Sequence, residues 1–283
     1  MTRNPPTIAS ALNEAAHRLA AVCDTPRLDA EVLLGFVLDR NRVHLHTWPD
    51  LLLPDEAMAR FDALITRRAT GEPLAYLTGR REFWSMELEV SPATLIPRPE
   101  TELLVEITLQ RIPAGSAWRI ADLGTGSGAI ALAIARERPA CRIVATERST
   151  TALTVARRNA ARLGIGNVEF REGIWLEPLA GEVFDLIVSN PPYIASEDPR
   201  LHTSEIRFEP ITALAAGPDG LDDIRHIAAA AGRHLAPGGG LLFEHGYDQS
   251  AAVARILTQS GYRKVHTHQD MSEIFRVTGG YRP

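Results

Sequence analysis

The spacing of apolar residues changes twice along this chain of 283 residues. Between residues 7 and about 70, apolar side chains recur every three or four positions, which places them on one face of successive helices. Two such runs are Leu12, Ala15, Ala16 and Leu19, and then Val32, Leu33, Phe36 and Val37. Residues 71 to about 97 show alternating, strand-like spacing with several turn formers, which is typical of a hairpin. The pattern predicts a small all-α domain at 1–72 and a linker with a β-hairpin at 73–97.

From Arg98 onward, short apolar runs alternate with helical patterns, which is typical of a mostly parallel sheet with helices on both faces. An α/β domain is therefore predicted at 98–283. In such sheets, ligands bind beyond the carboxyl ends of the strands, here those of the first and fourth strands. The strands are expected near residues 118–123, 142–147, 167–171, 184–189, 240–244, 263–267 and 274–278.

A glycine-rich loop follows the first of these strands. The buried run Ile120-Ala121-Asp122-Leu123 leads into Gly124-Thr125-Gly126-Ser127-Gly128, and an Ala-rich helix begins directly afterwards. Glycines at alternate positions let the backbone approach a ligand closely, and the helix N-terminus offers unpaired N–H groups. The next strand ends at Glu147, 19 residues beyond Gly128. A carboxylate at that place can accept hydrogen bonds from both hydroxyls of a ribose.

The spacing of this loop narrows the choice of cofactor. Nicotinamide and flavin sites use G-x-G-x-x-G with a pyrophosphate on the helix, whereas this loop is G-x-G-x-G preceded by Asp122. A carboxylate before the loop suits a ligand with an ammonium group and no phosphate, which describes the methionine end of S-adenosylmethionine. S-adenosylhomocysteine would then be the product. The residues expected to bind this cofactor are Asp122, Gly124, Thr125, Gly126, Ser127, Gly128 and Glu147.

The tetrapeptide Asn190-Pro191-Pro192-Tyr193 follows the fourth strand. An amide or aromatic-amine nitrogen is a poor nucleophile because its lone pair is delocalised, so a catalyst has to hold the NH2 group with acceptors. Asn190 supplies a side-chain carbonyl, the two prolines remove backbone donors, and Tyr193 offers a flat face for a planar group. The alternative is a simple turn after a strand. Together with the glycine loop and Glu147, the tetrapeptide indicates a methyltransferase.

Composition and charge restrict the kinds of partner that this chain is expected to bind. Hydrophobic residues make up 45% of the chain, which is enough for a proper core. The net charge is −5, and the first 90 residues hold 10 Arg against 13 Asp or Glu, which disfavours a permanent grip on DNA or RNA. Without a signal-peptide pattern or a run of eighteen apolar residues, we expect a soluble, cytoplasmic protein with no membrane partner. No metal site is expected, because the pairs His44/His46 and His266/His268 lack further ligands at suitable spacing.

Six segments of the chain carry a resemblance to a known family. They are Gly79-Arg80-Arg81-Glu82-Phe83-Trp84, Thr94-Leu95-Ile96-Pro97-Arg98-Pro99-Glu100-Thr101-Glu102, the loop from Asp122 to Gly128, Ser189-Asn190-Pro191-Pro192-Tyr193, Arg207-Phe208-Glu209-Pro210 and Glu244-His245-Gly246. With these segments the chain resembles the PrmC/HemK-type protein-(glutamine-N5) methyltransferases over nearly its whole length. Asn-Pro-Pro-Tyr is shared with adenine-N6 DNA methyltransferases, but Ile-Pro-Arg-Pro-Glu-Thr and Arg-Phe-Glu-Pro point to the glutamine enzymes.

The resemblance implies a fold, an activity and residue roles. The fold is a Rossmann-like class I methyltransferase domain with a helical domain that recognises the substrate. The substrate is the glutamine of the Gly-Gly-Gln loop in class 1 peptide chain release factors, methylated at N5. Asn190, Pro191 and Tyr193 are the implied catalytic residues: the Asn190 side chain and the Pro191 carbonyl hold the amide, and Tyr193 packs against its plane. Pro192 belongs to the same substrate site, Asn190 also contacts the cofactor, and the enzyme is expected to be a monomer without direct nucleic-acid contact.

Three places depart from the family pattern. The ribose acid is more often Asp than Glu, so Glu147 reaches with one extra methylene. Ile174 stands where an adenine-binding Asp is expected, whereas Trp175 remains and is expected to stack or pack on the adenine. The stretch Asp270-Met271-Ser272-Glu273-Ile274-Phe275-Arg276 also differs, which loosens the assignment of the last hairpin.

Two roles and three rival activities stay open. Glu100 or Thr101 either caps the following helix or contacts the cofactor, and Glu244 is either a structural hydrogen-bond partner or a site residue. One rival substrate is a glutamine of a ribosomal protein. Another is the adenine N6 of DNA, which the acidic charge balance disfavours. A scaffold that binds the cofactor without turnover would predict loss of Asn190 or of the glycines, and neither is lost.

Overall fold

The computed structural model describes residues 5–203 and 205–283. The chain divides into two compact units, with the boundary between Gly79 and Arg80. The segment 73–97, expected as a linker, is therefore shared between the two units. None of the helices in the described part of the chain has the length and apolar character needed to cross a lipid bilayer.

The first unit is a bundle of helices packed around one core. Phe61, Ile65 and Leu34 are among its fully buried side chains. The Thr7 hydroxyl accepts from the Ser10 backbone N–H at 3.2 Å and caps the first helix. The helices are α1 (Ile8–Leu19), α2 (Pro26–Leu38), α3 (Arg42–Thr47), α4 (Asp55–Ala69) and α5 (Leu74–Thr78).

Helix α5 corrects the expected pattern, because strand-like spacing was predicted from residue 71 onward. Leu77 is buried in the helical core, and Tyr76 is also buried. Gly79 ends the helix with a φ of +71°, a conformation that glycine adopts without steric cost. Five residues with two buried side chains give too short a repeat to separate a helix from a strand by spacing alone.

The second unit begins with the expected hairpin, β1 (Arg80–Phe83) and β2 (Met86–Glu89), which pair antiparallel. Its apolar side chains Phe83, Met86 and Leu88 are buried in the core of the α/β unit. The hairpin thus belongs to that unit by packing.

A seven-stranded sheet forms the centre of the second unit, in the order β5-β4-β3-β6-β7-β9-β8. The first five strands in this order run parallel, and β9 is antiparallel to both of its neighbours. The mostly parallel sheet is therefore confirmed, and the last hairpin is longer than expected. The strands are β3 (Arg119–Leu123), β4 (Arg142–Glu147), β5 (Val168–Glu172), β6 (Phe184–Ser189), β7 (Leu235–Glu244), β8 (Arg263–Gln269) and β9 (Phe275–Tyr281).

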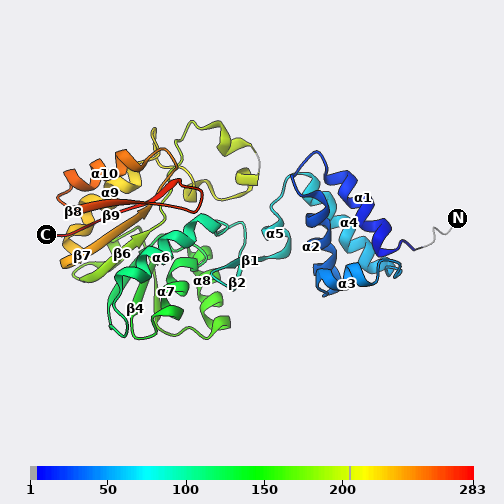
Figure 1. Ribbon diagram of the computed structural model, residues 1–283, viewed down its shortest axis with the longest axis horizontal. Coiled ribbons are helices and arrows are strands. Elements are labelled where there is room, and N and C mark those ends of the chain that lie inside the picture. Colours follow the sequence, from blue (N-terminus) through cyan, green and yellow to red (C-terminus); the bar gives the residue numbers. More distant parts are fainter. Residues whose placement is uncertain (1–4, 204) are drawn as a thin grey trace. The chain divides into compact units, whose positions relative to one another are not determined.

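Helices cover both faces of this sheet (Figure 1). One face packs against α6 (Glu102–Arg111), α7 (Ala129–Glu137) and α8 (Thr150–Leu163). The other packs against α9 (Asp222–Ala231) and α10 (Ser250–Gln259). Single 3₁₀ turns lie at Pro99–Thr101, Glu177–Leu179, Pro199–His202, Glu205–Phe208, Ile211–Ala213 and Gly232–His234.

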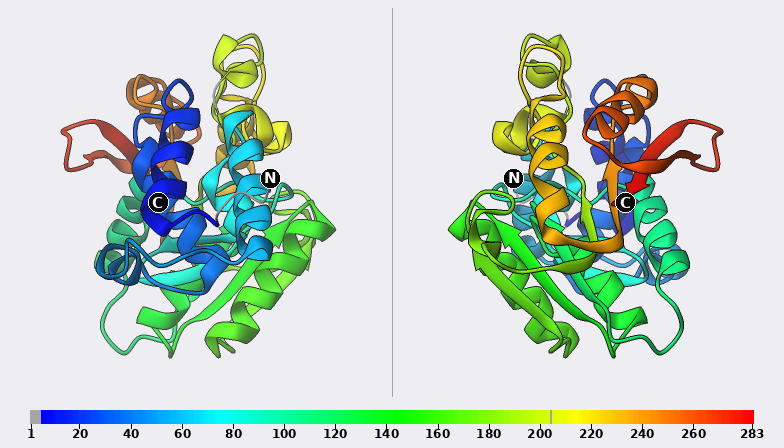
Figure 2. Two further views of the ribbon diagram at one scale, coloured as in Figure 1. Left: turned by 90° about the vertical axis from the view of Figure 1, so that its right-hand side faces the viewer. Right: turned by 90° about the vertical axis from the view of Figure 1, so that its left-hand side faces the viewer.

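The register of the parallel strands brings their carboxyl ends to one edge. Glu147 pairs with Glu172, and Leu123 pairs with both Thr146 and Ser189. These strands therefore end at the same level, and the residues that follow them lie along one edge of the sheet. The long connection from β6 to α9 consists mainly of short turns, and Figure 2 shows it in yellow-green, protruding from the rest of the α/β unit.

Candidate functional site

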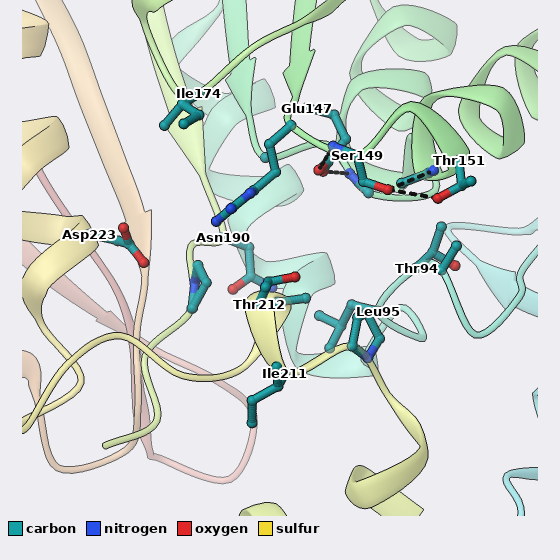
Figure 3. A pocket seen from close by; sticks show the side chains of 18 of the residues that line it. Thr94, Leu95, Glu147, Ser149, Thr151, Ile174, Asn190, Ile211, Thr212 and Asp223 are labelled. Carbon is teal, nitrogen blue, oxygen red and sulfur yellow. Dashed lines mark hydrogen bonds between the residues drawn. The ribbon is translucent and has the colours of Figure 1, made fainter. Parts of the chain in front are cut away.

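A cavity of about 470 Å³ opens at the edge where β3, β4, β5 and β6 end (Figure 3). We call it the first cavity. Its wall combines the glycine loop and the ends of β4 and β5 with two more distant segments, 93–95 and 210–213. The predicted residues on this wall are Gly124, Gly126, Glu147, Trp175, Asn190 and Pro192.

The glycine loop takes a conformation that only glycine adopts freely. The φ angles are +76° at Gly124, +58° at Gly126 and +88° at Gly128. A Cβ at Gly124 would also lie 2.8 Å from Cζ3 of Trp175. The absence of a side chain at Gly124 thus lets the indole ring pack directly on the loop.

Asp122 supports this loop from behind and does not line the first cavity. Its Oδ2 accepts from the Thr125 hydroxyl at 2.6 Å and from the Ala131 N–H at 3.2 Å. Its Oδ1 is buried with no partner among the described residues. Burial raises the pKa of Asp122 to about 7, because the charged form is taken out of water. Thr125, Ser127 and Gly128 likewise lie off the wall of this cavity.

Glu147 does lie on the wall, at the end of β4. Its two oxygens accept from separate backbone donors, Oε1 from the Ser149 N–H at 2.9 Å and Oε2 from the Gly126 N–H at 3.0 Å. The carboxylate is therefore anchored to both the glycine loop and the start of α8. The extra methylene relative to Asp is accommodated within this arrangement.

Ile174 and Trp175 follow β5 and form another part of the wall. Ile174 exposes 41% of its surface, and it offers no polar atom beyond its backbone. The Thr146 hydroxyl donates to the Trp175 carbonyl at 2.8 Å, which holds Trp175 in its left-handed conformation. Asp223 of α9 lines the same cavity. Sequence reasoning missed Asp223, because an acid in the first turn of a helix is common for stability alone.

Asn190 lies between the first cavity and a second one. The second cavity has about 360 Å³. Leu95, Asn190 and Ala213 line both cavities. Asn190 donates from Nδ2 to the Thr101 hydroxyl at 3.2 Å, and among the described residues no partner engages its Oδ1, which can accept from a ligand.

The rest of the tetrapeptide divides between the two cavities. Pro192 lines the first and Tyr193 the second, whereas Pro191 is buried and its side chain lines neither. Gln249 donates to the Tyr193 carbonyl at 2.9 Å, and burial raises the pKa of the Tyr193 phenol. The phenol is therefore neutral at physiological pH.

Thr101 and Glu244 form the polar support behind Asn190. Thr101 makes no side-chain capping bond to α6, so capping, one of its two open roles, is not what it does. Glu244, at the end of β7, is buried, and its Oε2 has no partner among the described residues. Burial raises the pKa of Glu244 to about 7, although the polar neighbours Thr101 and Asn190 favour the charged form. Glu244 lines neither of the two cavities, which favours a structural role.

Two segments that marked the family resemblance bind each other. Glu209, from Arg-Phe-Glu-Pro, forms an ion pair with Arg98, from Ile-Pro-Arg-Pro-Glu-Thr. The other Glu209 oxygen accepts from the Ile96 N–H at 3.1 Å, and the side chain of Glu209 is 1% exposed. This contact fixes the segments 93–98 and 209–213 as neighbours, and both contribute to the walls of the two cavities. The sequence motifs did not reveal the pairing, because 111 residues separate the partners.

The second cavity is lined by more charged side chains than the first. These side chains come from loops and from β9. The charged groups are Arg98, Asp198, Arg200, Asp219, Asp248 and Arg276. Gly246 and Gln249 add polar atoms, and Tyr193 adds an aromatic ring.

Comparison with known proteins places these features in context. Residues 10–79 match the family described as PrmC N-terminal domain, and residues 99–208 match the family described as methyltransferase small domain. A release factor glutamine methyltransferase of Xylella fastidiosa (strain Temecula1) is 55% identical over 257 residues, which are 91% of this chain and 94% of the relative. The release factor glutamine methyltransferase of Escherichia coli (strain K12) is 49% identical over 269 residues, 95% of this chain and 96% of the relative.

A solved structure supports the fold assignment of the α/β unit. A 16S rRNA methyltransferase from T. thermophilus, in complex with AdoMet and guanosine, matches 72% of this chain and 50% of its own with a TM-score of 0.55. The sequence identity is 18%, so the likeness concerns the fold. The predicted class I methyltransferase fold is therefore confirmed.

Proposed function

Because the chain belongs to the family of release factor glutamine methyltransferases, we propose that it methylates N5 of the glutamine in the Gly-Gly-Gln loop of class 1 peptide chain release factors. The methyl donor is S-adenosylmethionine. The observation that supports this most directly is the position of Asn190, which lines both cavities and keeps its side-chain carbonyl free to accept. A group held at that carbonyl lies where the two cavities meet.

The residues of the first cavity fit the proposed cofactor. Glu147 presents an anchored carboxylate to the ribose hydroxyls, and Trp175 and Ile174 offer apolar surface to a purine. Gly124 and Gly126 allow close approach of the backbone, while Asp122 and Thr125 hold the loop in place. When bound, S-adenosylmethionine supplies an electrophilic methyl group on a sulfonium with a good leaving group.

The tetrapeptide activates the substrate amide by position. The Asn190 Oδ1 and the Pro191 carbonyl each accept one N–H of the glutamine NH2, and the Tyr193 ring packs against the amide plane. With the cofactor bound, these contacts would turn the nitrogen lone pair toward the first cavity, from which the sulfonium would supply its methyl group and leave as the thioether. The proton that the methylated nitrogen gives up would pass to water. Positioning and the two acceptors supply the rate enhancement without a strong general base.

The first unit is proposed to recognise the release factor, since this is the part matched by the PrmC N-terminal domain. The enzyme acts as a monomer in the cytoplasm, where its substrate works in translation, and it does not bind nucleic acid directly. A glutamine of a ribosomal protein is the rival substrate of the same chemistry.

The test is transfer of labelled methyl groups from S-adenosylmethionine to four acceptors, followed by mass mapping. The acceptors are an unmodified class 1 release factor, its loop variant with Ala in place of the glutamine, a mixture of ribosomal proteins, and duplex DNA. Label on the loop glutamine, absent from the Ala variant, is the expected result. Label on ribosomal protein or DNA alone would overturn the substrate, and no label on any acceptor would overturn the activity.

A further inference from the structure

We propose that Asp223 binds the 6-amino group of the purine in the cofactor and makes the first cavity selective for adenine over a 6-oxo purine. The inference rests on the proposed use of S-adenosylmethionine and names a residue from an element that the sequence motifs do not include. Asp223 belongs to α9, whereas the expected acid would have followed β5 at the position of Ile174.

The position of Asp223 fits the base end of the cofactor. Figure 3 shows Asp223 and Ile174 on one side of the cavity and Thr94 and Thr151 on the opposite side, with Glu147 between them. If Glu147 binds the ribose, the base extends toward one of these two sides. Ile174 and the Trp175 ring give the side of Asp223 the apolar surface that the faces of a purine require.

The edge of an adenine needs a hydrogen-bond acceptor for its exocyclic amine. Two carboxylates line the first cavity, those of Glu147 and Asp223. Glu147 is the carboxylate assigned to the ribose hydroxyls, and its two oxygens also accept the backbone N–H groups of Ser149 and Gly126. Ile174 has no side-chain acceptor. Asp223 is therefore the carboxylate that can meet the amine.

The surroundings of Asp223 act on its ionisation in both directions. Burial raises the pKa of Asp223, and the charge of Asp222 adds to this effect. The indole N–H of Trp175 and the charges of His226 and Arg148 act in the opposite direction and favour the ionised form. The interaction with Trp175 also connects the carboxylate to the aromatic surface, so that one side chain orients the other. An ionised carboxylate has about four acceptor positions, which leaves room for a ligand amine.

A purely structural role is the competing explanation, in which Asp223 only holds the Trp175 indole. The two explanations differ in one respect. A structural Asp223 would affect 6-amino and 6-oxo purines equally, whereas a base-reading Asp223 would discriminate between them. A site built to hydrogen-bond one group rejects an analogue that cannot make the bond, because its own polar atom is left unpaired.

The experiment measures binding of S-adenosylhomocysteine and of its 6-oxo analogue, S-inosylhomocysteine, by calorimetry to the full-length protein. The wild type is expected to prefer the 6-amino ligand by about tenfold or more, the scale of one lost hydrogen bond to a charged group. In Asp223→Asn the preference should fall to about threefold or less, because the amide can turn to offer either an acceptor or a donor. Asp222→Asn is the matched control, since this neighbouring acid is exposed, pairs with Arg225 and does not line the cavity.

A rescue variant tests the position independently of folding. In an Asp223→Ala background, Ile174→Asp should restore part of the preference for the 6-amino ligand, because it returns a carboxylate to the same end of the cavity. An unchanged preference in Asp223→Asn would overturn the assignment of Asp223 while leaving the cofactor intact. Failure of the wild type to bind S-adenosylhomocysteine at all would overturn the proposed cofactor, and this inference with it.

Discussion

The two cavities of the α/β unit share Asn190 but are built in different ways. The first is formed largely by residues that directly follow β3, β4, β5 and β6, with backbone and glycines close to the ligand space. The second is formed by charged and polar side chains from loops and from β9. The first cavity, the proposed cofactor site, thus depends on sheet register and backbone shape, whereas the second, the proposed acceptor site, depends on long-range contacts between loops.

The largest effect is expected at Asn190, because its side chain lines both cavities. Asn190→Ala removes the proposed acceptor for the substrate amide, so methyl transfer should fall by roughly 10²-fold or more. Stability should change little, because the side chain is only half-buried. Initial rates with labelled S-adenosylmethionine and a thermal melt measure the two effects.

Gln110→Ala is the control for Asn190→Ala, because Gln110 carries an exposed amide on α6 whose partner is Glu106 in the same helix. Its activity should stay near the wild-type value. Normal turnover of folded Asn190→Ala would contradict the role given to this amide.

Gly124 tests how far ligand binding in the first cavity depends on a backbone without a side chain. Gly124→Ala places a Cβ 2.8 Å from Trp175 in a residue with φ +76°, so S-adenosylhomocysteine should bind at least ~10-fold more weakly. Gly164→Ala is the matched control, because Gly164 has φ +67° and open space around its Cβ position at the end of α8. Both variants should lose about 1 kcal/mol of stability from the left-handed conformation. Equal ligand affinity in the two variants would refute the importance of the contact with Trp175.

The loop contacts shared by both cavities can be weakened at Glu209. Glu209→Gln removes the charge that pairs with Arg98 and weakens the link between the segments 93–98 and 209–213. We expect the KM for the release factor to rise by about three- to tenfold, the cost of weakening a charge-assisted hydrogen bond. Glu169→Gln, which breaks an exposed pair with Arg171, is the control and should leave KM unchanged. A change confined to melting temperature in Glu209→Gln would show that the pair stabilises the fold without shaping the substrate site.

The smallest expected effect is a pH dependence of stability. It comes from two buried carboxylates that line neither cavity, Asp122 and Glu244. The pKa of each is raised to about 7 from an ordinary value near 4, so between these pH values the native state holds protons that the unfolded state has lost. The free energy of unfolding should therefore fall as pH rises from about 4 to about 7 and stay low above that.

Glu244→Gln removes one of these two contributions and should flatten the pH dependence of the melting temperature. At pH 8 the variant should melt at least roughly 2 °C higher than the wild type, while at pH 5 the two should be close. The decrease of melting temperature with pH that remains in this variant is attributed to Asp122. A wild type whose melting temperature rises from pH 5 to pH 8 would contradict the raised pKa values.

Much of the α/β fold followed from the apolar pattern, and the reason is local. Strands such as β4 and β6 are short apolar runs bounded by turn residues, and their predicted bounds match the structure. β7 was expected to begin at residue 240 but begins at Leu235, because Leu235 pairs with Phe184 ahead of an irregularity in the ladder, where Gly238 takes a turn-like φ of +77°. The helix α5 was missed because its five residues are too few to show the period of a helix.

The sequence by itself determined the motifs that are contiguous in the chain: the glycine loop, the acid Glu147 at a strand end and the tetrapeptide that begins with Asn190. Each of these motifs consists of residues that are adjacent in the chain, and the regular order of a parallel sheet suffices to bring the motifs to one edge. Only the tertiary structure decided which distant residues complete the site. It paired Glu209 with Arg98, set Thr101 beside Asn190, and brought Asp223 to the same side of the cavity as Ile174, where the sequence led us to expect an acid. These contacts depend on how loops and helices pack over the sheet, and that packing leaves no periodic signal in the order of the residues.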